Sequence, residues 1–135
     1  MKIFAVYDTN ILVSGLLSKR PDSAVVLTLD ALLNQEVTPL YNQEILDEYR
    51  DVLHREKFKL PKELVDSVVN QIEKDGLLAD RVHADEVFTD PDDVVFYEVA
   101  LSKEDAFLVT GNTKHFPKKP IVVSPAEFLK ILGKL

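Results

Sequence analysis

Apolar runs alternate along this chain with segments of helical periodicity, and this alternation limits the folds that the chain can adopt. The runs 2–7 and 106–111 are rich in Ile, Phe, Val, Leu and Tyr, without a regular change between apolar and polar residues. Such runs are typical of strands buried on both faces of a parallel sheet. The sequence therefore predicts an α/β fold: a three-layer α/β/α sandwich around a central, mostly parallel sheet of four or five strands.

The other segments complete this pattern. Periodicity predicts a helix that begins near Ile11, and further helices over 21–34, 42–58, 61–76, 89–104 and 124–135. Asn42, Asp90 and Ser124 are of the residue types preferred as N-caps. Short strands are predicted at 37–41, which Pro39 weakens, and at 120–123 on an edge of the sheet. The segment 77–88 has no clear pattern, and a short strand is one interpretation of it.

Composition sets the outer limits of these predictions. The chain has 135 residues, 46% of them hydrophobic, and no linker-like segment divides it, so we expect a single domain over 1–135. We find no long apolar segment typical of a membrane span and no signal peptide pattern, and we expect a soluble, unexported, cytoplasmic protein. The absence of Cys excludes disulfides and thiolate metal sites. A net charge of −7 argues against a broad nucleic-acid surface but not against a local site with metal-binding carboxylates.

Two polar residues follow the predicted buried strands and are candidates for a site. Asp8 comes directly after the first strand, and Asn112 directly after the segment 106–111. Ligand sites of open parallel sheets lie outside the carboxyl ends of the strands, so both side chains face one crevice if these strands are neighbours. For Asp8, a simple role as the cap of the following helix remains the alternative.

One of four acids on the predicted helix 42–58 borders its buried face. Ile45, Tyr49, Val52 and Leu53 form the apolar stripe. At about 100° per residue, Glu48 lies roughly 100° from the middle of that stripe, and the other acids lie farther away. Glu48 is therefore the acid of this helix that can lean toward a strand end, although a solvated surface acid is the alternative interpretation.

The stretch TDPDD at 89–93 has the densest local acidity of the chain. Asp90 as a cap, followed by Pro91 and two acids in the first turn, is an arrangement that the helix dipole favours. Asp93 shares a stripe with apolar residues of the helix, however, and so does Asp92. Periodicity cannot separate a capping role from an inward-facing acid, and it cannot choose between these two.

The ordered set of these motifs is similar to that of a known family. VYDTNILVSGLLS, helical ILDEYRDVL, DPDDVVFYEVAL and then AFLVTGNTKHFP with VVSPAEFL occur in this order. The set resembles the PIN domain family of small metal-dependent ribonucleases, and within it the VapC-like toxins of toxin–antitoxin pairs. The likeness extends from Lys2 to about Leu129. It implies Asp8, Glu48 and Asp93 as the acidic site residues, with Asn112 in the place of the family's fourth acid.

The resemblance further implies an endoribonuclease that uses Mg²⁺ or Mn²⁺, a small antitoxin partner and a homodimer. Both ions prefer oxygen ligands, which Asp8, Glu48 and Asp93 would supply. Thr9 or Asn10 would orient Asp8, and Asn112 would hold a water of the ion. An empty site of apposed carboxylates should raise at least one pKa. The candidate partners for substrate phosphates are loop cations: Lys19, Arg20, Lys114, His115, Lys118 and Lys119.

Three classes of function stay open at this point. The first is the nuclease toxin, and the second is a catalytically weak PIN module that binds RNA or a partner protein, with Asn112 as the mark of lost charge. The third is a phosphoacceptor domain with one Asp at a strand end. That class needs paired acids beside the strand, whereas the segment 8–10 supplies one acid. The three histidines form no zinc-binding pair, and no phosphate-binding glycine loop occurs.

Overall fold

A computed structural model describes residues 2–134 of the chain and contains one parallel sheet within that range. The strands stand in the order β3-β2-β1-β4-β5, and all neighbours run parallel. The bounds are β1 (Phe4–Tyr7), β2 (Thr38–Tyr41), β3 (Leu77–Leu78), β4 (Phe107–Val109) and β5 (Val122–Val123). This arrangement confirms the predicted α/β class and places β1 at the centre, between β2 and β4.

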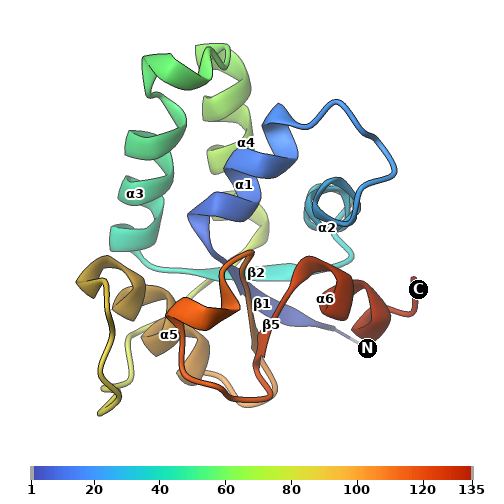
Figure 1. The fold of residues 1–135 in the computed structure, drawn as a ribbon. Helices are drawn as coiled ribbons and strands as arrows, with labels where there is room; N and C mark the ends of the chain where they lie inside the picture. The colour runs from blue at the N-terminus through green and yellow to red at the C-terminus, as the bar shows by residue number, and fades with distance from the viewer. Residues whose placement is uncertain (1, 135) are drawn as a thin grey trace.

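The connections between the strands form the helices. These are α1 (Thr9–Leu17), α2 (Ala24–Leu33), α3 (Gln43–Leu53), α4 (Lys62–Asp75), α5 (Val94–Leu101) and α6 (Pro125–Ile131), with short 3₁₀ turns η1 (Glu56–Phe58), η2 (Pro91–Asp93) and η3 (Thr113–His115). Figure 1 shows α1, α2 and α4 above the sheet and α5 below it. None of the helices in the described range has the length and apolarity that crossing a bilayer requires.

Side-chain caps explain where several helices begin. The side chain of Asn42 accepts a hydrogen bond from the amide of Ile45, and Ser124 and Glu127 form a reciprocal capping box. The predicted helix 42–58 is interrupted, because α3 ends at Leu53 and η1 follows as a separate turn. Leu53 is the last core residue of that segment, and the residues after it are mostly exposed, so burial no longer stabilises the helix. The last residue of the predicted helix 124–135 lies outside the described range.

Pro39 does not keep β2 at an edge of the sheet. The amide of Thr38 donates to Ile3 on the β1 side, so the nitrogen of Pro39 faces the β3 side, where pairing starts one residue later, at Leu40. Gly76 precedes β3, and a Cβ at this position would lie 2.6 Å from the Pro39 carbonyl oxygen. The strand therefore accommodates proline because a glycine lets the neighbouring chain approach closely.

The apolar residues of α4 belong to the core. Val65, Val68, Val69 and Ile72 are all buried in the core that surrounds the sheet. Their helical spacing is equally compatible with a core face or a dimer interface, and burial decides for the core. The segment 77–88 contains only the two-residue β3, and the rest of it has no regular secondary structure.

Candidate functional site

Asp8 lies at the carboxyl end of the central strand. It stands at the N-cap position of α1. That helix lies wholly within the described range, and the Asp8 carboxylate forms no capping hydrogen bond with it. Its Oδ2 instead accepts a hydrogen bond of 2.8 Å from the hydroxyl of Thr110, and its amide donates to the carbonyl of Val109 at 2.9 Å. Asp8 is 7% exposed. The backbone amides of Thr9 and Asn10 lower the pKa of this acid, so the first turn of α1 still interacts with it, but its side-chain hydrogen bond links it to the residue after β4.

The residue after β4 that contacts Asp8 is Thr110 rather than Asn112. The strands β1 and β4 are neighbours, as the sequence analysis required. Thr110 is fully buried, whereas Asn112 is exposed and donates its amide hydrogen to the Thr110 hydroxyl at 3.0 Å. Sequence reasoning missed Thr110. Its signal was a hydroxyl residue placed directly after a buried strand, where a carboxylate needs a donor.

The two residues after Asp8 do not orient it with their side chains, contrary to our expectation. The hydroxyl of Thr9 donates to Oε2 of Glu48, and the Oδ1 of Asn10 accepts from the amide of Gly111 at 3.3 Å. Successive residues of the first helical turn point in different directions, so they reach different neighbours. Thr9 thus connects α1 to α3, and Asn10 connects α1 to the loop after β4.

The structure distinguishes the acids that periodicity left ambiguous. On α3, Glu48 is half-buried and Asp47 and Asp51 are exposed, which confirms the helical placement. At 90–93, Asp90 caps the turn η2 by accepting from the amide of Asp92, which is itself exposed. Asp93 turns inward.

The Asp93 side chain is partly buried, and one of its carboxylate oxygens is buried without a donor. Its side chain is 16% exposed, and among the described residues its Oδ2 has no hydrogen-bond partner. Nδ1 of His115 lies 3.9 Å from that oxygen. Burial of a carboxylate oxygen without a donor costs about 1–3 kcal/mol, so the position favours a positively charged ligand.

Burial and mutual repulsion perturb all three acids. Burial raises the pKa of Asp8, and the charge of Glu48 raises it further, while the Thr110 hydrogen bond opposes both. Burial likewise raises the pKa of Glu48. The Thr9 hydrogen bond opposes this rise, and the charges of Asp92, then Asp93, add to it. The pKa of Asp93 rises to about 6, through burial first and the charge of Asp8 second. The expected rise in pKa is present, but desolvation is its main cause rather than repulsion.

The donor set fits a hard divalent cation. Each of the three carboxylates lies within electrostatic reach of the other two, and carboxylate oxygens are the ligands that Mg²⁺ and Mn²⁺ prefer. In residues 2–134, however, no group of three or more acidic or histidine side chains already lies as close together as metal ligation requires. A metal site here would require these side chains to move, and the partnerless oxygen of Asp93 would gain most from a bound cation.

A salt-bridged segment next to the site was not recognised in the sequence. Arg81 donates to Oε1 of Glu98 at 2.7 Å and to Glu44 at 2.9 Å, and the amide of Ala84 donates to the other oxygen of Glu98 at 2.8 Å. Glu98 is on α5 and Glu44 is on α3. These contacts hold the irregular segment 79–90 against the helix that carries Glu48 and the helix that follows Asp93.

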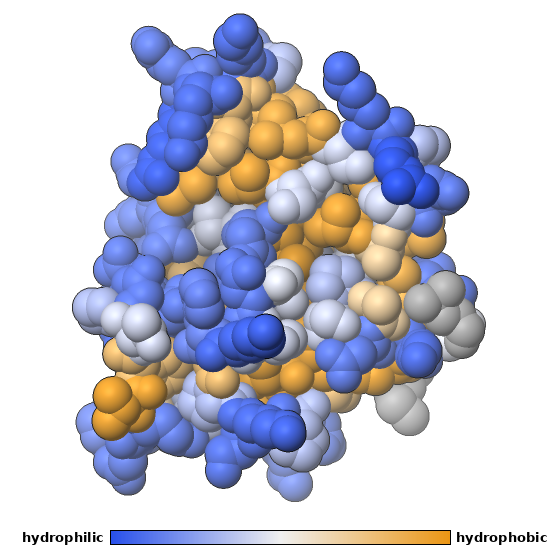
Figure 2. All heavy atoms as spheres, viewed as in Figure 1, coloured by the Kyte–Doolittle hydropathy of each residue, from blue (hydrophilic) through white to orange (hydrophobic). Residues whose placement is uncertain are grey.

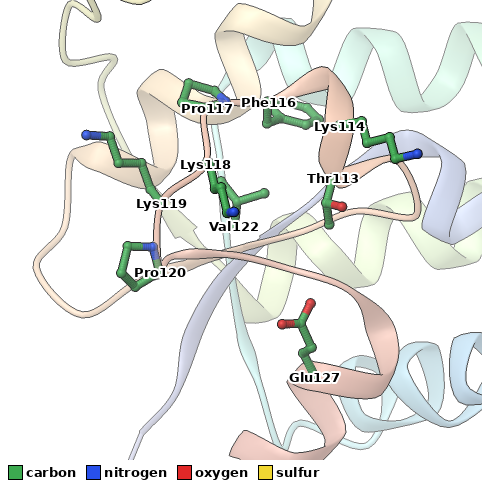
Figure 3. A pocket seen from close by; sticks show the side chains of 9 residues that line it. All are labelled: Thr113, Lys114, Phe116, Pro117, Lys118, Lys119, Pro120, Val122 and Glu127. Atoms are coloured by element: carbon green, nitrogen blue, oxygen red, sulfur yellow. The ribbon is translucent and has the colours of Figure 1, made fainter.

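The predicted phosphate partners are exposed cations in loops. Lys19, Arg20, Lys114, Lys118 and Lys119 are exposed and form no ion pair with any residue of the described range. Three of them, Lys114, Lys118 and Lys119, line a cavity of about 790 Å³ (Figure 3). The acids themselves do not line this cavity.

One comparison with known proteins identifies the family. A family model described as PIN domain matches residues 5–114, which is well over half of the chain and includes Asp8, Glu48, Asp93 and Asn112. No curated protein and no solved structure matches the chain. PIN domains are generally nucleases, and such nucleases generally use divalent metals. With a match of this extent and a parallel sheet of the expected kind, the chain belongs to the PIN domain family.

Proposed function

We propose that this protein is a metal-dependent endoribonuclease that hydrolyses phosphodiester bonds of RNA with Mg²⁺ or Mn²⁺, and that its single catalytic domain spans 1–135. The observation that carries the proposal is electrostatic: Asp8, Glu48 and Asp93 come from distant segments, yet within each pair the charge of one acid raises the pKa of the other. The partnerless oxygen of Asp93 and the raised pKa values of all three support a cation as the missing partner.

The residues of this site have different roles. Asp8, Glu48 and Asp93 hold the ion, Thr110 keeps one oxygen of Asp8 in place, and Asn112 offers an amide oxygen at the exposed rim. When bound, the ion polarises the phosphate and lowers the pKa of an attacking water. Burial of Asp8 limits competing water, so its charge acts in a low dielectric environment.

The proposed biological role is that of a toxin held inactive by a small antitoxin in the cytoplasm. The role rests on the likeness of the ordered motifs to VapC-like toxins. Figure 2 shows apolar surface at the top of the molecule, above the hydrophilic middle, where α1, α3 and α4 meet in Figure 1. Leu17 on α1 and Leu64 on α4 are 42% and 39% exposed. Such a surface supports a protein partner, either the antitoxin or a second copy in a homodimer.

A cleavage assay tests the nuclease proposal. We expect the protein to cut a mixed single-stranded RNA in Mn²⁺ or Mg²⁺, and EDTA or Asp8→Asn to abolish the cleavage. Asp47→Asn, which removes an exposed acid one residue from Glu48, should cleave like the parent. Growth arrest on expression of the parent but not of Asp8→Asn would support the toxin role. Cleavage that persists in EDTA would refute a metal-dependent mechanism.

One observation favours a second candidate function, a catalytically weak PIN module that binds RNA or a partner protein. Asn112 stands in the place of the family's fourth acid, so one negative charge is missing from the site. In the described range, the acidic side chains are not arranged to bind a metal ion. The two functions differ in one measurement. Binding of Mn²⁺ and RNA without any cleavage would identify the binding module, and turnover that requires Asp8 and metal would exclude it.

A further inference from the structure

Three lysines line a cavity formed mainly by the segment after Asn112, and we call it the lysine pocket. It is lined by most of the segment 113–120, together with Val122 and Glu127, and has a volume of about 790 Å³. Ligand pockets of proteins typically measure roughly 300–1,000 Å³. Figure 3 shows Lys114 and Lys119 extending in opposite directions on two sides of the pocket, with Lys118 between them. The three ammonium groups are therefore spread along the pocket.

The charge at this pocket is opposite to that of the whole molecule. The protein has a net charge of −7, yet the segment 111–121 contains three lysines and a histidine and no acid. None of the three lysines forms an ion pair within residues 2–134. Glu127 is the one acid of the lining, and its Oε1 accepts from the amide of Ser124 as part of the helix cap. Lys119 is close enough to Glu86 to lower the pKa of that acid, but in the described structure it forms no ion pair with it. Exposed cations attract a polyanion, and attraction to phosphates is the main source of nucleic-acid affinity.

The segment that follows Asn112 connects the lysine pocket to the carboxylates. The turn η3 follows Asn112, whose amide donates to the hydroxyl that binds Asp8. His115, within the same turn, places Nδ1 at 3.9 Å from Oδ2 of Asp93. A strand whose phosphate lies at the carboxylates therefore has the lysine pocket as its neighbouring surface. Lys118 and Lys119 lie beyond residue 114, where the family match ends.

The walls of the pocket suit an unpaired nucleotide. Phe116 is 7% exposed, and its ring packs edge-on against Phe88 at 6.1 Å, so it forms a floor rather than a stacking platform. Pro117, Pro120 and Val122 add apolar surface for a base or sugar. Bases enter protein pockets when they are unpaired and unstacked, whereas a duplex keeps them inside the helix. The pocket thus favours single-stranded RNA.

We infer that the lysine pocket binds the unpaired RNA segment next to the scissile phosphate, with Lys118 and Lys119 on successive phosphates. The inference rests on the proposed nuclease function and specifies its substrate: single-stranded RNA, held on the side of η3. A phosphate contact from each lysine contributes a slope of about −0.7 to the dependence of log K on log salt concentration.

The test measures RNA binding in the absence of cleavage. A labelled 12-nucleotide oligouridine is titrated in EDTA with three proteins: the parent, the pocket variant Lys118→Gln/Lys119→Gln and the control Lys57→Gln/Lys74→Gln. Fluorescence anisotropy at several salt concentrations measures binding. Lys57 and Lys74 are exposed on η1 and α4, so the control removes the same charge elsewhere. We expect the pocket variant to bind about 5- to 10-fold more weakly than the control, with a salt slope smaller by about 1.4.

Two further ligands separate the alternatives. The pocket substitutions should weaken binding of an RNA hairpin stem less than binding of oligouridine. An equal loss of affinity for both RNAs would overturn the assignment to an unpaired strand. A polyglutamate peptide tests for an acidic protein partner. If the pocket variant loses peptide binding while its oligouridine affinity equals that of the control, the RNA assignment is wrong.

Cleavage measured in parallel keeps this inference separate from the proposed function. A parent that cleaves RNA with Mn²⁺, combined with a pocket variant that binds like the control, would refute the lysine pocket and leave the nuclease intact. A parent that binds oligouridine through the pocket but never cleaves with Mn²⁺ would refute the nuclease and leave the pocket as an RNA-binding site.

Discussion

The acids at the sheet edge differ in how well their neighbours satisfy them. Oδ2 of Asp8 accepts a hydrogen bond from a fully buried hydroxyl, Oε2 of Glu48 accepts one from Thr9, and Oδ2 of Asp93 has no partner in the described structure. A hydrogen bond to a carboxylate favours its charged form, whereas burial without a donor favours the neutral form. Asp8 and Glu48 are thus oriented in advance, and Asp93 is the side chain that a ligand would stabilise most.

Replacing the hydroxyl that binds Asp8 tests this orientation. Thr110→Val keeps the shape of a buried side chain but removes the donor, so the pKa of Asp8 should rise further and metal-dependent cleavage should fall about tenfold. Isothermal titration of Mn²⁺ and the cleavage rate report the effect. Thr28→Val is the matched control, because Thr28 is also fully buried but its hydroxyl donates to Pro125, away from the acids. Equal rates for the two variants would contradict the role of Thr110.

The pKa of Asp93 predicts how the stability of the metal-free protein depends on pH. The folded state holds the Asp93 proton up to a pKa of about 6, whereas the unfolded state loses it near 3.8. Between these values the folded state binds more protons, so the free energy of unfolding should rise as the pH falls, by on the order of 1 kcal/mol from pH 7.5 to 5. Urea unfolding in EDTA at several pH values measures this slope. Asp93→Asn should reduce it and the exposed Asp92→Asn should not; an unchanged slope in Asp93→Asn would be inconsistent with a raised pKa.

At the level of elements, α3 and α5 are connected through the irregular segment between β3 and η2. Arg81 bridges Glu44 of α3 and Glu98 of α5, and Glu98 is 6% exposed. The hydrogen bond from Ala84 and the contact with Arg81 lower the pKa of Glu98. Since Glu48 lies on α3 and Asp93 directly precedes α5, these contacts help to set the distance between two of the site acids.

Neutralising Glu98 should weaken this connection. Glu98→Gln removes a buried charge that binds Arg81 and the Ala84 amide, and we expect a loss of about 1–3 kcal/mol in the free energy of unfolding at pH 7. The contribution is present above the ordinary Glu pKa and is lost as the pH falls through the lower folded value, so the variant and the parent should converge in acid. Glu73→Gln breaks a half-exposed pair with Arg50 and should change stability by less than about 0.5 kcal/mol. Equal losses in the two variants, measured by urea unfolding, would contradict a special role for Glu98.

At the scale of the whole molecule, ligand binding at the acids and the stability of the fold are linked. The three carboxylates come from segments far apart in the chain, so the unfolded chain does not hold them together. A cation that binds only the folded state must stabilise that state. Folding and the proposed metal site therefore depend on the same tertiary arrangement.

Thermal unfolding with and without Mn²⁺ measures this linkage. A concentration of about 100 times Kd should stabilise the parent by about 2.7 kcal/mol and raise Tm by roughly 10 °C. Asp93→Asn should lose most of this shift, because it removes the partnerless oxygen, and Asp47→Asn should keep it. A shift of the same size in all three proteins would place the ion elsewhere.

Local sequence was sufficient to predict most elements and the residues at their ends. Asn42 and Ser124 cap helices as predicted, β5 forms at an edge, and Glu48 borders the buried face of α3. These features depend on neighbours within a few residues, which the sequence shows directly. The break after Leu53 and the accommodation of Pro39 within the sheet depend on packing partners from other segments, and periodicity does not report those partners.

The site shows the same division between local and distant determinants. The order of residues alone determined the class of fold, the position of Asp8 and Asn112 after buried strands, and the acid of α3 that can turn inward. Only the tertiary structure decided that Thr110 binds Asp8, that Asp93 rather than Asp92 is inward-facing, and that Arg81 connects two helices. The physical reason is distance along the chain: hydrogen bonds and burial across 102 residues, as between Asp8 and Thr110, arise only when the strands pair.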